Sequence, residues 1–292
     1  MCKFKSAIIL KDRVFVPDYD SHTEMLEELG IADTRANAER LFVRAELIPK
    51  NYDVFSDVSE WRFNVDQDIT PDWFVAEYEK ERMIEAVKAW AKNRIFIGCD
   101  DLVLRDGKSF YIKNCKNVSC ENSTVTAWGN STVTAWGNST VTAWENSTVT
   151  AWGNSTVTAR ENSTVTAWEN STVTACENST VTAWGNSTVT AWGNSTVTAR
   201  ENSTVTACEN STVTAWGNST VTARENSTVT ARENSTVTAR ENSTVIRDIW
   251  SSFNTDRLVL SDNSTFKDCV TRTLYQSGDF KLVTVTDGKI GG

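Results

Sequence analysis

Histidine is almost absent from this chain: His22 is the only one among 292 residues. A single imidazole cannot build a metal site from several histidines, and it argues against a Ser-His-Asp triad. The glycine-rich fingerprints that hold nucleotide phosphates are missing as well. Because the segment Ser21-His22-Thr23-Glu24 has the form of a capping box, we expect His22 at the surface rather than as a catalytic base. These absences predict a protein that is not an enzyme.

Positive charge is also scarce. The net charge is −9, and acidic side chains equal or outnumber basic ones in each of residues 1–120, 121–249 and 250–292. Phosphate backbones and anionic bilayers bind basic surfaces, so we expect neither nucleic acid nor membrane as a partner. No apolar run approaches the length of a membrane span, and the one at residues 7–10 is too short for a signal peptide. We therefore expect a cytoplasmic location.

The seven cysteines are scattered along the chain and odd in number, which favours reduced thiols over a disulfide framework. Cys115 and Cys120 lack the spacing of a zinc site, and no second pair lies near them in the sequence. The acidic pairs within residues 66–68 and 100–101 are of a kind that is usually solvated in turns. We therefore expect no metal ion and no cofactor.

What the chain does contain is a tandem repeat. The octapeptide Asn-Ser-Thr-Val-Thr-Ala-Trp-Gly begins at Asn122 and recurs every eighth residue until the copy that begins at Asn242. The first six residues are the same in every one of the sixteen copies except the last. Such regularity predicts an array in which each copy packs on its neighbours and buries little by itself.

The composition of the repeat predicts β-strands. Ser-Thr-Val-Thr-Ala is rich in β-branched residues, and alternate side chains of a strand face opposite ways. In the first copy, Ser123, Val125 and Ala127 would share an inward face that is small and apolar. Thr124 and Thr126 would then point outward. The Asn that opens each copy and the Gly or Glu that closes it would form a corner.

One octapeptide is too short to close a coil, so two or three copies must form each turn of a parallel β-helix. Three copies would form a triangular prism. We favour two copies per coil, because inward Ser and Ala suit a thin core. The expected fold is therefore an α+β N-terminal domain followed by an all-β solenoid.

Four regions follow from these patterns: a small α+β domain at 1–98, a transition and N-terminal cap at 99–121, the repeat solenoid at 122–249, and degenerate coils with a C-terminal cap at 250–292. Within the last region, Asn263-Ser264-Thr265-Phe266 reads as a degenerate copy. Terminal repeats are expected to be atypical because they cover an open end.

Periodicity places the elements of the N-terminal domain. A hairpin is expected from strands at 7–10 and 14–16, with further strands at 41–48 and 61–65. A short helix is expected at 25–29, ending at Gly30. A longer helix is expected from Thr70, as N-cap before Pro71, to about residue 94. The apolar side chains at helical spacing in this segment indicate core packing.

All variation in the first fifteen copies lies at positions seven and eight. Position seven is Trp, Arg or Cys, and position eight is Gly or Glu. Codons for Trp, Arg and Cys differ by single bases, as do those for Gly and Glu, so we favour neutral drift at an exposed or corner position. The alternative is an aromatic ladder for self-association or for binding a glycan or protein. The candidate residues for that role are Trp128, Trp136, Trp184 and Trp192.

The repeat also resembles a known family. Ser-Thr-Val-Thr-Ala-Trp-Gly is similar to the half-repeat of bacterial ice-nucleation proteins, which carry Gly-Ser-Thr-x-Thr-Ala with a nearby aromatic residue in sixteen-residue coils. The similarity covers residues 122–249, although the unit here is a strict octamer and Asn replaces Gly before Ser. The resemblance implies a Thr-x-Thr array that orders ice-like water. The threonines at the family's positions include Thr124, Thr126, Thr132, Thr134, Thr180 and Thr182.

The N-terminal half resembles uncharacterised bacterial and phage proteins that place a small domain before a variable repeat array. The similar segments are 2–7, 42–46 and 65–73. This resemblance implies modularity only. We therefore expect a non-enzymatic protein that acts as a structural scaffold or an interaction surface, with ice binding or glycan or protein binding as alternatives.

Overall fold

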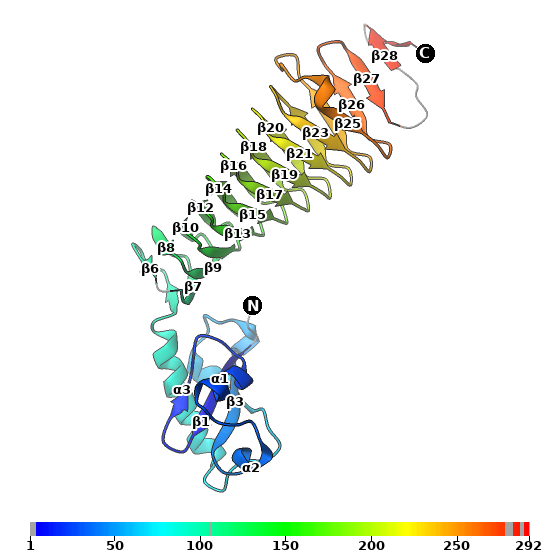
Figure 1. The fold of residues 1–292 in the computed structure, drawn as a ribbon. Helices are drawn as coiled ribbons and strands as arrows, with labels where there is room; N and C mark the ends of the chain where they lie inside the picture. The colour runs from blue at the N-terminus through cyan, green and yellow to red at the C-terminus, as the bar shows by residue number, and fades with distance from the viewer. Residues whose placement is uncertain (1–3, 106, 278–282, 287–288, 292) are drawn as a thin grey trace. The chain divides into compact units, whose positions relative to one another are not determined.

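The computed structural model describes residues 4–105, 107–277, 283–286 and 289–291 (Figure 1). Cys2, in the similar segment 2–7, and Asp106 lie outside these residues. The chain divides into two compact units, Met1–Ile97 and Gly98–Gly292. No helix of the described residues is long and apolar enough to cross a membrane.

The N-terminal unit is built on a four-stranded antiparallel sheet. Its strands are β1 (Lys5–Leu10), β2 (Val14–Phe15), β3 (Phe42–Ile48) and β4 (Arg62–Val65), in the order β2-β1-β3-β4. The expected hairpin is confirmed, because Ile8 pairs with Phe15 and Ile9 pairs with Val14. The remaining elements are the helices α1 (His22–Glu28), α2 (Arg35–Ala38) and α3 (Ala76–Ala91) and the 3-10 turns Lys50–Tyr52 and Val58–Glu60.

The expected cap at Ser21 is confirmed, because the backbone N–H of Glu24 donates to Ser21 Oγ at 3.3 Å, and α1 therefore begins at His22, earlier than the expected range 25–29. The predicted start of the long helix is wrong. Pro71 opens a turn that the Phe74 N–H closes at 2.9 Å, and α3 starts only after Val75. The indole N–H of Trp73 donates to the Arg40 carbonyl at 2.9 Å. This long-range hydrogen bond holds Trp73 in a non-helical conformation, so the helix does not start at Pro71 although the local sequence favours it.

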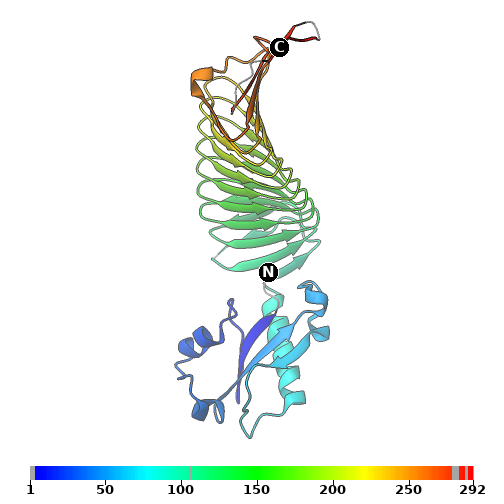
Figure 2. The same ribbon diagram turned by 90° about the vertical axis from the view of Figure 1, so that its right-hand side faces the viewer.

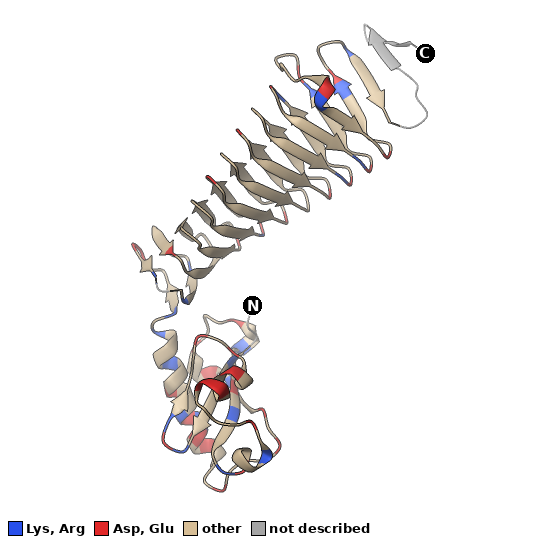
Figure 3. Cartoon of the chain, viewed as in Figure 1, with Lys and Arg blue, Asp and Glu red and all other residues tan. Residues whose placement is uncertain are grey.

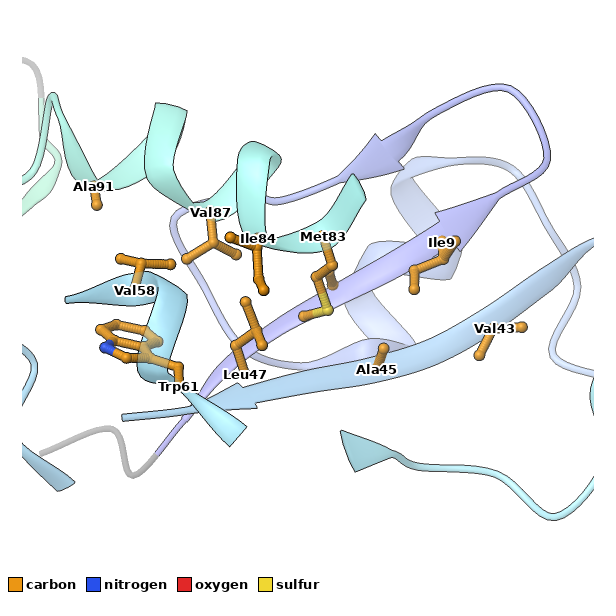
Figure 4. Packing of buried hydrophobic residues seen from close by; sticks show 11 residues of the cluster. Ile9, Val43, Ala45, Leu47, Val58, Trp61, Met83, Ile84, Val87 and Ala91 are labelled. Carbon is orange, nitrogen blue, oxygen red and sulfur yellow. The ribbon is translucent and has the colours of Figure 1, made fainter. Parts of the chain in front are cut away.

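Side chains on the two faces of the sheet form two hydrophobic clusters. One lies under α3 and contains Met83 and Val87 of the helix with Ile9 and Val43 of the sheet (Figure 4). The other lies under α1 and contains Ile8, Met25, Leu26, Ala38 and Phe42. The prediction that the apolar side chains of α3 pack in the core is therefore confirmed, except for Tyr78, which is 63 % exposed.

The second unit is a parallel β-solenoid made of two sheets (Figure 2). Within the repeats, each strand pairs with the strand sixteen residues away, as Val133 does with Val149 and Val141 with Val157. Two octapeptides therefore make one coil, as favoured from the small inward residues. One sheet takes the even-numbered strands from β6 to β26, and the other takes the odd-numbered strands from β7 to β25.

The strands of the array share one pattern. From β11 (Thr140–Ala143) to β23 (Thr236–Ala239), each strand is a Thr-Val-Thr-Ala segment of four residues. The flanking strands are β5 (Ile95–Ile97), β6 (Val103–Leu104), β7 (Ser109–Lys113), β8 (Val118–Glu121), β9 (Thr124–Trp128), β10 (Thr132–Trp136), β24 (Thr244–Arg247), β25 (Leu258–Leu260), β26 (Thr265–Asp268), β27 (Thr273–Gln276), β28 (Val283–Thr286) and β29 (Lys289–Gly291), with a 3-10 turn at Thr255–Arg257.

The interior of the array is formed by the predicted inward residues. The repeat Val and Ala side chains are at most 1 % exposed, and every repeat Ser is at most 3 % exposed. Buried hydroxyls need partners, and these serines have them: Ser147 Oγ donates to the Trp144 carbonyl at 2.7 Å and lies 3.1 Å from the Gly129 carbonyl of the previous coil. Serine therefore closes the corner within its own coil, and at alternate corners, as at Ser155 and Ser171, it also bonds to the coil below.

The backbone conformation at the corners explains why Gly or Glu occupies position eight and Asn occupies position one of the repeat. At representative corners Gly129 has φ +68°, Glu145 has φ +52° and Asn146 has φ +66°. This left-handed conformation costs glycine little and is tolerated by asparagine. Glutamate at the same place retains the steric penalty of an L-residue.

The C-terminal end of the array departs from the repeat. The degenerate copy forms β26 and stacks in parallel on β24, with Phe266 opposite Val245. Strand β27 then pairs with β26 in the antiparallel sense, and Tyr275 stacks on Phe266 at 5.7 Å between ring centroids. The reversal of direction ends the parallel stack.

Candidate functional site

Each sheet of the solenoid displays two columns of threonine. The first Thr of a strand is exposed in most coils and the second is half-buried, whereas Val and Ala, which alternate with them, point inward. Of the predicted residues, Thr124 and Thr126 lie on β9 in one sheet. Residues 132, 134, 180 and 182 lie on β10 and β16 in the other sheet. The predicted Thr-x-Thr set is therefore divided between two faces.

The threonine positions form a regular grid. In-register pairing places Thr164 beside Thr180 and Thr166 beside Thr182 in successive coils. Neighbouring strands lie about 4.8 Å apart, and two residues along a strand span about 6.6 Å. Charged side chains lie at the turns and ends of the array and not on its central strands (Figure 3). The two faces are therefore uncharged and rich in hydroxyl and methyl groups.

One corner of the solenoid carries a stack of tryptophans. Trp136, Trp152, Trp168 and Trp184 lie at position seven of every second copy. Their ring centroids are 5.5, 5.0 and 5.0 Å apart, and successive planes differ by 8° or less. Parallel rings at this separation have the offset geometry that aromatic pairs favour. The Trp ladder expected from the sequence is thus four consecutive rings at a single corner.

Arginine continues this aromatic column. The Arg200 guanidinium lies 4.6 Å from the ring centroid of Trp184 and 5.6 Å from that of Trp216. Arg232 lies 4.3 Å from the Trp216 centroid on the other side and forms an ion pair with Asp248 at 2.6 Å. A planar guanidinium can stack on an aromatic face, so Arg can replace Trp within the column. The column therefore runs from tryptophan into an alternation of arginine and tryptophan.

The opposite corner has a different composition. The predicted residues Trp128 and Trp192 lie there, whereas Trp136 and Trp184 belong to the stacked column. Trp128 is only 8 % exposed and stacks on Tyr111 at 6.4 Å. Trp128 therefore lies at a corner, one of the two expected places, but it is not exposed there, because Tyr111 of the coil below covers it. The eight tryptophans do not form one surface.

This second corner also carries most of the glutamates at position eight. Successive coils place Glu145, Glu161 and Glu177 in one column, and the Asn146 N–H donates to the Glu161 carbonyl at 3.1 Å. Arg160 lies 5.1 Å from the Trp144 ring centroid and 4.0 Å from the Glu177 carboxylate. The two edges of the solenoid are therefore chemically distinct, one aromatic and one acidic.

Cys120 and Cys208 are buried thiols, and Cys176 is partly buried. Burial raises the pKa of Cys176 and of Cys208, and it raises the pKa of Cys120 to about 11. The thiolate is the nucleophilic form, so these side chains are poor nucleophiles at neutral pH. Cys120 takes the place of the inward Ala, since it pairs with Ala135 in register. These cysteines therefore contribute to the packing of the coils.

His22 does not lie at the surface as expected, because its side chain is only 11 % exposed. It lies beside carboxylates from two other segments of the N-terminal unit. Comparison of the chain with protein-family models, with curated proteins and with solved structures finds no match. The resemblances to ice-nucleation repeats and to phage proteins therefore rest on the motifs alone, whereas the Thr-rich solenoid is a property of the fold.

Proposed function

We propose that the chain is a non-enzymatic repeat protein of the cytoplasm, whose solenoid is a rigid scaffold that displays an interaction surface. The observation that supports this proposal is the distribution of variation. The inward Ser, Val and Ala repeat without change through fifteen copies, and substitutions are confined to the corners. Fully paired sheets with a constant core resist bending, so the display has a fixed spacing.

Hydrogen exchange of the full chain tests the scaffold. Strand amides of the central coils, β14 (Thr164–Ala167) to β19 (Thr204–Ala207), should exchange only after sub-global opening and remain protected for hours. Amides at the corners should exchange much earlier and act as the internal control. Loss of protection in the central strands within seconds would exclude a rigid array.

Ice binding is a second candidate, favoured by the two uncharged threonine grids. The resemblance to ice-nucleation repeats points to the same residues. The test is inhibition of ice recrystallisation by the full chain. Two variants distinguish the two sheets: Thr180 and Thr182 are replaced by Lys on one face, and Thr188 and Thr190 are replaced by Lys on the other. Loss of activity in one pair only would identify the binding face, and no activity in the parent chain would reject the candidate.

A glycan- or protein-binding role is favoured by the partly exposed tryptophan column. Trp184 belongs to the column, and Trp192 lies at the opposite corner with 37 % exposure. Substitution of Trp184 by Ala should abolish ligand-induced quenching of tryptophan fluorescence if the column is the site. Trp192→Ala is the matched control. Equal effects of the two substitutions would contradict a site on the column.

A further inference from the structure

Three potential metal ligands meet on one face of the N-terminal sheet. His22 is the first residue of α1, Glu46 lies on β3, and Asp66 directly follows β4. Their ligand atoms all lie within 4.8 Å of one another. One of these contacts joins His22 Nδ1 to Asp66 Oδ2 at 3.2 Å, across 44 residues of sequence. Three segments thus contribute one ligand each to a single cluster.

A backbone carbonyl fixes the orientation of the His22 ring, so that Nδ1 is the nitrogen that faces the carboxylates. Nε2 lies 3.3 Å from the carbonyl oxygen of Ala45, which can only accept a hydrogen bond. This contact places a proton on Nε2, so the lone pair of the neutral ring is on Nδ1. Metal-binding histidines use the same arrangement, with the non-ligating N–H donating to a backbone carbonyl. In the neutral ring the Nδ1 lone pair faces Asp66 Oδ2 at 3.2 Å, whereas in the imidazolium Nδ1 donates to that oxygen.

No lysine or arginine of the described residues neutralises the carboxylates of the cluster. Within the residues that the structure describes, neither Glu46 nor Asp66 pairs with a lysine or arginine, while the neighbouring Arg44 is ion-paired with Asp33. The Asn64 amide donates to Glu46 Oε2 at 3.1 Å and orients this carboxylate. A lone pair and two anionic groups at this separation repel one another unless a proton or a cation lies between them.

A buried hydroxyl lies beside the same cluster. Ser6 is paired in register with Glu46 between β1 and β3, so the two side chains project from the same face of the sheet. Ser6 is 0 % exposed, and its Oγ has no hydrogen-bond partner among the described residues. Such a hydroxyl can donate to a ligating carboxylate or to a metal-bound water. It is a second feature, independent of the acidic groups, that points to this place.

We propose that His22, Glu46 and Asp66 form a binding site for a divalent cation of the zinc class. One imidazole nitrogen and two carboxylate oxygens are a ligand set that zinc accepts, and three protein ligands leave a fourth position for water. Such an ion joins the N-terminus of α1 to β3 and to the end of β4. The site is independent of the solenoid and of the function proposed for it.

The single histidine makes the test specific. In the full chain labelled with 15N-histidine, every imidazole signal belongs to His22, so zinc bound by cysteines elsewhere does not mimic the result. We expect the apo ring to be the Nε2–H tautomer, and Zn²⁺ to shift the Nδ1 resonance with 1:1 stoichiometry. An unchanged resonance at saturating Zn²⁺, or an apo ring that is imidazolium at neutral pH and unaffected by Zn²⁺, would overturn the proposal.

Two variants complete the test. Asp66→Asn should weaken the Zn²⁺ effect on the His22 resonance by roughly 10- to 100-fold or more, since a ligand is lost. Asp68→Asn, an exposed acid two residues further on, is the matched control and should leave the titration unchanged. Glu46→Gln keeps the shape of the side chain and should also weaken binding. Equal Zn²⁺ affinities in all three variants and the parent chain would overturn the assignment of the ligands.

Discussion

At the scale of single residues, the corner position exposes a conflict between backbone and side chain. Glu161 has φ +49° and lies between Glu145 and Glu177 in its column. A left-handed L-residue costs energy that glycine avoids, and glycine already occupies this position in other copies, with Gly153 at φ +69°. The repeat therefore tolerates glutamate at a cost.

We expect Glu161→Gly to raise the free energy of unfolding by about 1 kcal/mol, because relief of the left-handed strain exceeds the added entropy of the unfolded chain. The measurement is chemical denaturation of the full chain. Glu161→Gln is the control, since it removes the charge but keeps the strain. If Gln stabilises as much as Gly, then charge repulsion and not φ is the cause.

Cys120 permits a prediction of pH dependence. Burial raises the pKa of its thiol from 9.0 to about 11 in the folded chain. Between these values the unfolded chain binds fewer protons at this site, so stability must fall as pH rises from 9 to 11, by roughly 2–3 kcal/mol. Below pH 9 the contribution is fully present. Unfolding free energies measured from pH 8 to 11 should show this loss.

Cys120→Ala is the matched control for that titration, because Ala occupies the equivalent inward position in the copies that follow. The variant should retain the fold and lose the component of the pH dependence that Cys120 contributes. An identical slope in parent and variant would mean that other groups cause the loss of stability.

At the scale of elements, the sixteen-residue period assigns position seven to two separate columns. Trp168 stacks on Trp152 and on Trp184, whereas Trp192 has Cys176 and Cys208 as its column neighbours. Two residues that look equivalent in the repeat therefore have different surroundings. The sequence shows this difference only when alternate copies are compared.

Trp168→Ala should lower the free energy of unfolding by about 2 kcal/mol, because it removes two ring-stacking contacts worth about 0.5–1.5 kcal/mol each. Trp192→Ala should cost less in the same denaturation experiment. Equal losses in the two variants would show that stacking does not distinguish the columns and that burial alone sets the cost.

The elements of the N-terminal unit show where local signals fail. The capping sequence at Ser21 correctly located the start of α1, since the cap and the helix are adjacent in sequence. The equally good signal at residues 70–71 did not start α3, because Trp73 is held by a partner on another segment. Helix signals describe what a segment favours alone, and long-range contacts decide between competing local minima.

At the scale of the whole molecule, the array depends on its ends. Strands β7 and β8 pair with the first coil, and β25 and β26 pair with the last strands of the two sheets. Without them, both sheets would present rows of unpaired N–H and C=O groups. Such edges are templates for further strand addition.

A chain restricted to residues 122–249 should therefore be insoluble or form fibres, whereas the full chain should remain dispersed. Sedimentation and electron microscopy of the two chains provide the comparison. A soluble, monomeric repeat fragment that unfolds cooperatively would contradict the capping role of the flanking segments.

The sequence by itself determined the strand pattern of the array, its inward Ser, Val and Ala, its outward Thr and its Asn and Gly corners, because these follow from alternation and turn preference within one octapeptide. The small inward residues also favoured two copies per coil. Only the tertiary structure decided which copies become neighbours, and hence the aromatic and acidic edges and the division of the threonines between two faces. The same holds for His22, Glu46 and Asp66, since pairing between distant strands, and not any local pattern, brings them together.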